Sequence, residues 1–247
     1  MKSPVVQFQI MRLLLTVLAI ALALNGIALA QKPQETHQHE GEQDPTKTLP
    51  KAYQLEFEND WVRIVRVHYE AKGTLPEHEH PGGVTVYLYL NASDGVVFTH
   101  DNRFGLIPRP PVVAGAIRIG NGPLEHHSVT NNAATPSDFV RVLLKTSTIP
   151  KRGNPVARMS PSAMEYDHPM MHLQRINVQP GTTTRIEAKN FPVLRLAWIP
   201  DKTEWRVPAT EGFRFLDKGT TEDFAVSGNV PMQLVTIELR TPIGKTR

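Results

Sequence analysis

Short runs of alternating apolar and polar residues, separated by turn-forming residues, fill the chain from residue 52 onward. They are rich in β-branched and aromatic residues at a period of two, which is typical of half-buried β-strands. Proline and glycine, at 21 and 16 residues, interrupt the apolar positions too often for long helices. The pattern predicts an all-β fold, with a first series of strands at residues 53–57, 62–69, 84–90, 95–99, 116–119, 127–130 and 139–144.

A second series of strands follows residues 150–165, a stretch without periodicity that indicates a linker. Its strands are expected at residues 172–178, 184–188, 193–199, 204–207, 213–216, 224–227 and 233–239. An offset of 108 residues places Gly73 on Gly181 and superposes the most apolar strands of the two series. We interpret this as a duplication of one small β-barrel, with barrels at 51–149 and 166–247.

The N-terminal segment has the order of features of a signal peptide. A positively charged start precedes the apolar run 13–24, and the small-x-small pattern 28–30 follows. A transmembrane anchor is the alternative, but a membrane span needs roughly 20 apolar residues. We therefore expect residues 1–30 to be removed from an exported protein, periplasmic or secreted, without a stable membrane span, whether translation begins at Met1 or Met11.

Residues 31–50 are polar and contain almost no apolar residues. Such a segment cannot bury enough surface to offset the entropy of ordering, so we expect a flexible lead. His37 and His39 lie within it and are interpreted as solvated side chains rather than metal ligands.

Charge and composition exclude several classes of function. The formal net charge is +3, and loss of the signal peptide, which has two basic residues and no acidic one, lowers it to +1. No cluster of lysine or arginine remains to bind a phosphate backbone, so no nucleic-acid partner is expected. The chain has no cysteine, which excludes disulfides, thiolate nucleophiles, thiolate ligands and a lipid-anchored cysteine.

Two groups of histidines, about fifty residues apart, are the candidate chemistry. His78 and His80 stand at the entrance to the apolar strand at 84–90. Residues i and i+2 of a strand share a face, so both imidazoles can meet one metal ion inside a barrel. Adjacent residues of a strand face opposite sides, so only one of His126 and His127 can join them.

These segments resemble the two sequence motifs of the cupin superfamily. The match rests on His78 and His80 beside glycine-proline turns and on the later element from His127 to Asn131. It covers residues 52–147 well and the second series more loosely. The resemblance implies a bicupin with two tandem jelly-roll barrels, and one divalent metal ion (iron, manganese, zinc, nickel or copper) bound to His78, His80 and His127.

The cupin pattern is incomplete in one place. Many metal cupins add a glutamate four or five residues after the second histidine, where this chain has Val84 and Thr85. Three neutral imidazoles leave open coordination positions and an uncompensated 2+ charge, which favours a small anionic ligand such as a carboxylate or enolate. Glu77, Glu79 or Glu125 are the alternatives for a carboxylate ligand, although Glu79 is expected to face away.

The second series lacks the ligands. The offset puts Ile186 and Ala188 at the positions of the first two histidines, and the later motif puts Ala225 at the position of the third. We expect a degenerate barrel with a dry interior that serves packing or homodimerisation. His168 and His172 stand four residues apart, but Pro169 prevents the unbroken helix that would bring them together.

Two classes of function remain open. One is an enzyme that oxidises, isomerises or hydrolyses a small oxygen-rich molecule at the metal ion. The other is a binding module that captures such a ligand, or the metal, without turnover, and the fold does not choose between them. An acid or base that faces the ion would favour the enzyme. The candidates are Glu77, Glu125, His68, His100 and Tyr87, of which His68 and His100 are expected to be structural.

Overall fold

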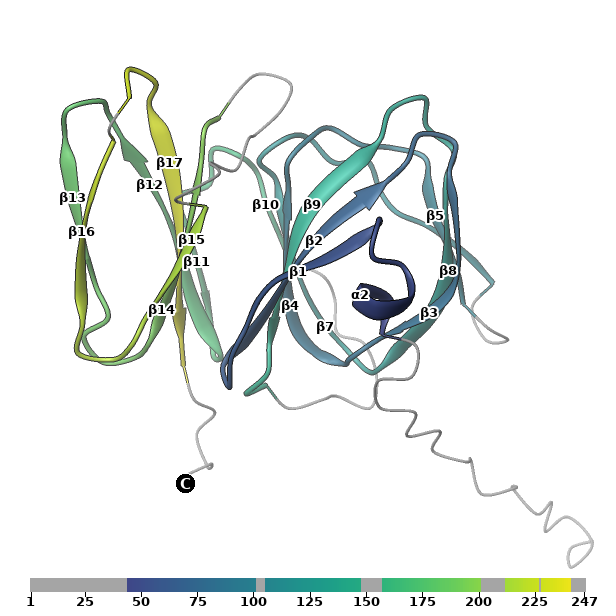
Figure 1. Cartoon of the computed structure of the whole chain (residues 1–247), viewed down its shortest axis with the longest axis horizontal. Coiled ribbons are helices and arrows are strands. Elements are labelled where there is room, and N and C mark those ends of the chain that lie inside the picture. Colours follow the sequence, from purple (N-terminus) through teal and green to yellow (C-terminus); the bar gives the residue numbers. More distant parts are fainter. Residues whose placement is uncertain (1–43, 101–104, 148–156, 201–211, 227, 241–247) are drawn as a thin grey trace, which may run out of the picture. The chain divides into compact units, whose positions relative to one another are not determined.

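The computed structural model describes residues 44–100, 105–147, 157–200, 212–226 and 228–240. Within these ranges the chain forms antiparallel β-sheets and one short helix, α2 (Pro45–Thr48) (Figure 1). The all-β prediction is confirmed. The predicted signal peptide, His37 and His39 lie outside the described residues, as does the strand expected at 204–207. No described helix has the length and apolar character needed to cross a membrane.

The first barrel consists of two sheets that face each other (Figure 1). The larger sheet has, in spatial order, β1 (Tyr53–Glu58), β2 (Val62–Tyr69), β9 (Ser137–Leu144), β4 (Gly83–Tyr89), β7 (Ile117–Gly122) and β10 (Ala157–Met159). The smaller sheet has β3 (Thr74–His80), β8 (Glu125–Asn131), β5 (Val96–His100) and β6 (Leu106–Pro108). Every strand pairing in both sheets is antiparallel.

The second barrel also consists of two described sheets. The larger has, in spatial order, β11 (Glu165–His168), β12 (Met171–Val178), β17 (Met232–Leu239), β14 (Val193–Trp198) and β15 (Phe213–Leu216). The smaller pairs β13 (Thr183–Glu187) with β16 (Thr221–Ala225). Its interior is a closely packed apolar cluster that includes Ile186, Ala188 and Phe224.

Strand β4 brings polar side chains into the interior of the first barrel, beside an apolar cluster. Successive side chains of a strand point to opposite faces. Val84 and Val86 belong to an apolar cluster that also contains Leu194 of the second barrel, whereas Thr85 and Tyr87 line the inside of the first barrel. Because the larger sheet buries its outer face against the second barrel, its inner face is free to carry polar side chains.

Contacts between the barrels support a packing role for the second one. Phe57 of β1 lies 5.6 Å from Phe213 and 6.1 Å from Phe215, measured between ring centroids. The buried Arg175 of β12 donates a hydrogen bond of 2.6 Å to the carbonyl oxygen of Gly115. A continuous apolar cluster therefore joins the two larger sheets.

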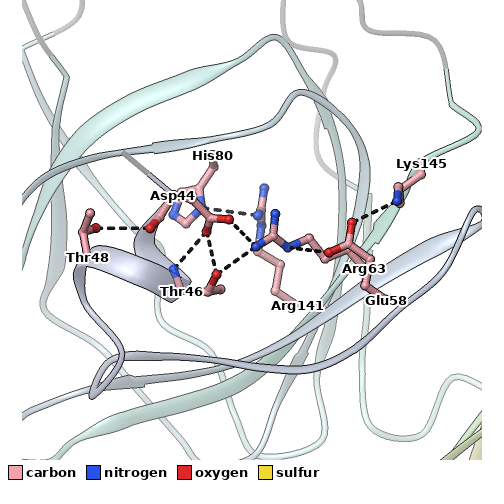
Figure 2. A network of polar contacts seen from close by, with 8 residues as sticks. All are labelled: Asp44, Thr46, Thr48, Glu58, Arg63, His80, Arg141 and Lys145. Atoms are coloured by element: carbon pink, nitrogen blue, oxygen red, sulfur yellow. Dashed lines mark hydrogen bonds and ion pairs between the residues drawn. The ribbon is translucent and has the colours of Figure 1, made fainter. Parts of the chain in front are cut away.

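The end of the predicted flexible lead is not flexible. Asp44 caps α2 by accepting a 3.0 Å hydrogen bond from the backbone N–H of Thr46, and Pro45 occupies the first turn. Arg63 of β2 donates to the same carboxylate at 2.5 Å (Figure 2). The expectation fails at residues 44–50 because these polar contacts are made with a strand that composition alone does not reveal.

Parts of the predicted linker also form strands. Residues 157–159 are β10, which pairs with β7 at the edge of the first barrel, and Glu165 begins β11 of the second. With three and four residues, few of them apolar, β10 and β11 show too little alternation to be recognised in the sequence. The intervening residues 148–156 lie outside the described ranges.

Candidate metal centre

Three histidines converge inside the first barrel from two neighbouring strands of the smaller sheet. His78 and His80 lie on the same face of β3, and His127 of β8 is the direct cross-strand neighbour of His78. Their exposed fractions are 0%, 5% and 3%. One potential ligand atom from each lies within 4.8 Å of the others. This is the only such cluster of metal-ligating side chains among the described residues.

The strand that carries the first two histidines was not predicted. His78 and His80 end β3, a strand of the smaller sheet, and do not open the apolar strand β4. The alternation of apolar and polar residues in β3 is hidden in the sequence, because Leu75 is followed by Pro76 and then by charged or polar residues. A register shift between Leu75 and His78 also breaks the alternation. The two histidines still share a face, because the regular part of β3 includes both.

The alternation of β8 separates the histidine pair as expected. His127 faces the interior, whereas His126 pairs with Glu79 in register and places Nδ1 at 3.1 Å from a carboxylate oxygen of Glu77. Glu77 and Glu79 therefore belong to the outer face of the sheet. Glu125 is the cross-strand neighbour of His80, and a carboxylate oxygen lies 4.0 Å from Nδ1 of His127. It is the acidic side chain nearest the cluster among these three.

The hydrogen bonds of His78 expose one ring nitrogen to the cluster. Nδ1 lies 2.8 Å from the carbonyl oxygen of Pro76, which can only accept, so Nδ1 carries the proton. Nε2 is then an acceptor, and the hydroxyl of Tyr53 donates to it at 2.8 Å. Tyr69 continues this chain, with 3.0 Å between the two hydroxyl oxygens. A backbone carbonyl on Nδ1 is a common way to orient a metal-binding imidazole.

His127 and His80 differ in their partners. Neither ring nitrogen of His127 has a hydrogen-bond partner among the described residues, although both are buried. A buried polar atom without a partner is costly, and a metal ion would satisfy it. Nδ1 of His80 accepts a 3.3 Å hydrogen bond from the guanidinium of Arg141 (Figure 2). The donor set of three buried imidazoles fits a divalent transition-metal ion.

Burial keeps the three imidazoles neutral. Desolvation lowers the pKa of His127 to about 2 and that of His80 well below its ordinary value, and the positive charge of Arg141 acts in the same direction on both. Desolvation also lowers the pKa of His78, against the opposing effect of the Pro76 carbonyl. Because a metal-binding histidine must be neutral, the site is preformed in the required protonation state.

His80 and His127 line a cavity of about 280 Å³ inside the barrel. Its lining contains three arginines, Arg109, Arg118 and Arg141, but among the described residues one carboxylate, that of Glu125. The wall also carries tyrosines, of which Tyr87 has its pKa raised to about 12, with desolvation as the largest cause. The cavity therefore has an excess of positive charge before any metal ion is added.

Other sequence candidates take separate places. His100 is the cross-strand neighbour of His127 on β5, lines the cavity, and has its ring centroid 5.2 Å from that of His127. His68 is half-exposed and pairs with Asp138 at 2.6 Å, so it is structural as expected. Asn131 is buried and donates to the carbonyl oxygens of Tyr69, Glu70 and Thr135, which ties the turn after β8 to the end of β2.

Sequence reasoning missed the three arginines and Tyr53. A signal for two of them was present. Arg118 and Arg141 are single charged residues within otherwise apolar predicted strands, a pattern that indicates a buried charge with a functional role. Arg109 lies in a proline-rich loop that shows no such pattern, and Tyr53 looks like an ordinary core residue.

The second barrel holds no equivalent cluster among its described residues. One detail of the predicted alignment was wrong, because Ile186 is the neighbour of Glu222 in register and Ala225 pairs with Thr183 instead. Ala225 is exposed, whereas Glu222 is buried and forms a 2.8 Å ion pair with Arg195. The pairing of β13 with β16 is therefore offset relative to that of β3 with β8.

Comparison with known proteins identifies the fold. No protein-family model matches the chain, and no curated protein matches it significantly. The crystal structure of AerE from Microcystis aeruginosa matches with a TM-score of 0.51 and 12% identity, covering 76% of this chain and 97% of that one. A putative glyoxylate-induced protein from Pseudomonas aeruginosa matches with a TM-score of 0.52 and 10% identity, covering 78% and 80%. A cupin domain from Bordetella pertussis matches with a TM-score of 0.33 and 16% identity, covering 38% and 91%.

Similarity at 10–12% identity shows the fold alone. With the topology described above, it defines this chain as a protein of cupin fold with two barrels in tandem. The fold implied by the histidine motifs is confirmed.

Proposed function

We propose that the first barrel binds one divalent metal ion through His78, His80 and His127 and, beside it, a small anionic organic molecule. The observation that carries this is the convergence of three buried, neutral imidazoles whose ligand atoms lie within 4.8 Å of one another, one imidazole having no hydrogen-bond partner in the described part of the chain. An ion held by three neutral ligands keeps open positions and its full charge, and so attracts an anionic oxygen.

The chain's own residues favour such a ligand. Arg141 is buried at the cluster and makes no ion pair with any described residue, so its charge can face a ligand anion. When Nε2 of His78 is engaged by an ion, the hydroxyl of Tyr53 loses its acceptor and can donate to a ligand oxygen instead. Aromatic side chains such as Phe98 and Phe139 form the apolar part of the wall.

Catalytic turnover is a second candidate function, favoured by two side chains. His100 and Glu125 both line the cavity beside His127, where either can hold or accept a proton at a bound molecule. Fold similarity does not name the reaction. Loss of turnover with retained ligand affinity in Glu125→Gln or His100→Gln would separate catalysis from binding.

Export is also proposed. The order of charged start, apolar run and small-residue pattern over residues 1–30 supports a cleaved signal peptide and action in the periplasm or outside the cell. Mass spectrometry of the exported product should find Gln31 as the first residue. A product that retains residues 13–30 would contradict this.

The binding proposal is tested with the cobalt-substituted protein, whose visible spectrum reports the coordination of the ion. Acetate or another small monocarboxylate should change that spectrum with a saturable dependence on concentration. A His127→Ala protein should show neither the cobalt spectrum nor the response. A spectrum that forms in wild type but ignores every small anion would contradict the proposed ligand class.

A further inference from the structure

A second cationic position in the cavity is not used by the metal centre. The guanidinium of Arg109 lies in the cavity wall and is 5% exposed. Its Nη2 donates hydrogen bonds of 2.6 Å to the hydroxyls of Ser93 and Ser137. Its Nε and Nη1 are buried and have no hydrogen-bond partner among the described residues. Two donor nitrogens of the guanidinium are therefore left without an acceptor in the part of the chain that the structure describes.

The protein offsets this charge only in part. Arg109 lies over the rings of Tyr89 and Phe139, at 5.1 Å and 5.6 Å from their centroids, which provides cation–π stabilisation. No described acidic residue forms an ion pair with it. Removing a guanidinium from water is costly unless an anion or enough hydrogen-bond acceptors compensate for its charge. The missing partner indicates an anion supplied by a ligand.

A row of aromatic rings connects this position with the histidines. The ring of Tyr53 lies 5.0 Å from that of His78, Tyr69 lies 6.0 Å from Tyr53, and Phe139 lies 5.4 Å from Tyr69. Phe139 in turn lies beneath Arg109. The cavity thus has a guanidinium at each of two places, that of Arg141 at the histidine cluster and that of Arg109, with an aromatic wall between them.

We propose that the cavity binds a small organic dianion, with one anionic group at the histidine cluster and the other on Nε and Nη1 of Arg109. Binding of the anionic group at the histidine cluster rests on the proposed function, whereas binding of the other group at Arg109 does not. The organic body of the ligand lies against the aromatic wall. The cavity volume of about 280 Å³ restricts the ligand to a small molecule.

The test compares linear dicarboxylates, from succinate to adipate, with monocarboxylates of the same carbon number on the cobalt-loaded protein. Calorimetry gives affinities and the cobalt spectrum reports coordination. At least one dicarboxylate should bind wild type about tenfold or more tightly than its monocarboxylate counterpart, about 1.4 kcal/mol. Arg109→Gln should abolish that preference and leave monocarboxylate affinity unchanged.

Ser137→Ala is the matched control, because it removes one of the ties of Arg109 and leaves the two unpaired donors in place. It should keep the dicarboxylate preference even if its melting temperature falls. Should Arg109→Gln fail to fold, Arg109→Lys retains the charge and loses the paired donors, and it should lower the preference.

Two results would overturn the inference. One is a wild type without preference for any dicarboxylate, and the other is an Arg109 variant that keeps the preference, which would make Arg109 a structural tie only. Measurements on the metal-free protein distinguish failure of this inference from failure of the proposed function. Adipate or a shorter dicarboxylate should still bind it weakly in an Arg109-dependent manner, even if no anion ever changes the cobalt spectrum.

Discussion

The guanidinium of Arg141 donates a hydrogen bond to Nδ1 of His80 inside the first barrel. A metal ion on Nδ1 would take the lone pair that Arg141 uses. An ion on Nε2 would require the imidazole proton to move to Nδ1, where it would meet an N–H of Arg141. Binding of an ion to His80 therefore requires Arg141 to give up this contact, and frees the guanidinium for a ligand.

Arg141→Met should consequently change metal and anion affinities in opposite directions. Removal of a buried positive charge beside the ion should raise metal affinity, because that charge repels the ion at short range. We expect an effect of about tenfold, which corresponds to about 1.4 kcal/mol. The same variant should bind acetate more weakly. Competition with a metallochromic chelator and acetate titration measure the two effects. Arg158→Met, an exposed position on β10, should change neither.

Thr85 offers a way to add the glutamate that the cupin pattern lacks. Its side chain is buried and lines the cavity. Thr85→Glu should tighten the metal ion by adding a negative oxygen ligand and should weaken small carboxylates that compete for the same position. Thr85→Gln is the uncharged control of equal size. Tighter carboxylate binding by Thr85→Glu than by wild type would show that the open positions lie elsewhere.

Metal release should accompany acid unfolding. Free histidine, with a pKa of about 6.5, would release the ion between about pH 6 and 5. In the folded protein burial lowers the pKa of His80 and His127, so protons compete less for the ligands. The unfolded chain binds more protons than the folded one below about pH 6.5, so the free energy of unfolding is highest above that pH and falls as the pH falls.

This is checked by following the cobalt spectrum and the circular dichroism of one sample during acidification. The two transitions should coincide, and the metal-free protein should lose stability steadily below about pH 6.5. Loss of the cobalt spectrum between pH 6 and 5, with unchanged circular dichroism, would mean that the histidines titrate as solvated groups.

Glu222 of the second barrel should matter for stability and not for metal binding. It is buried and paired with Arg195, and removing one partner of such a pair costs on the order of 3 kcal/mol or more. Glu222→Gln should therefore lower the melting temperature and leave metal content per folded chain unchanged. Asp223 follows Glu222 on β16 and forms an exposed ion pair with Arg185 of β13. Asp223→Asn, which breaks that pair, should leave the melting temperature unchanged.

Periodicity predicted the strands that alternate over five or more residues, and β2 and β15 match their predicted ranges fully. It did not predict β3, since Pro76 and its polar neighbours hide the pattern, nor the short edge strands β6, β10 and β11. Spacing and face predicted that His78 and His80 act together with one of His126 and His127, and the resemblance to the cupin motifs selected His127.

The rest of the site could not be predicted, because it depends on contacts between distant segments. Arg109 reaches the cavity from the loop after β6, and its neighbours are Ser93, in an isolated bridge after β4, and Ser137, at the start of β9. Tyr53 joins the cluster from the edge strand of the opposite sheet. The residue pattern of a single segment does not show which distant segments it contacts in the folded chain.

Metal content per chain tests the central claim most directly. Protein purified with metal supplied during growth, dialysed and measured by elemental analysis should contain one divalent ion per chain, and His80→Ala or His127→Ala should contain none. His126→Ala should keep the ion, since that imidazole faces outward toward Glu77. An ion retained by the triple variant of His78, His80 and His127, or lost in His126→Ala alone, would contradict the account.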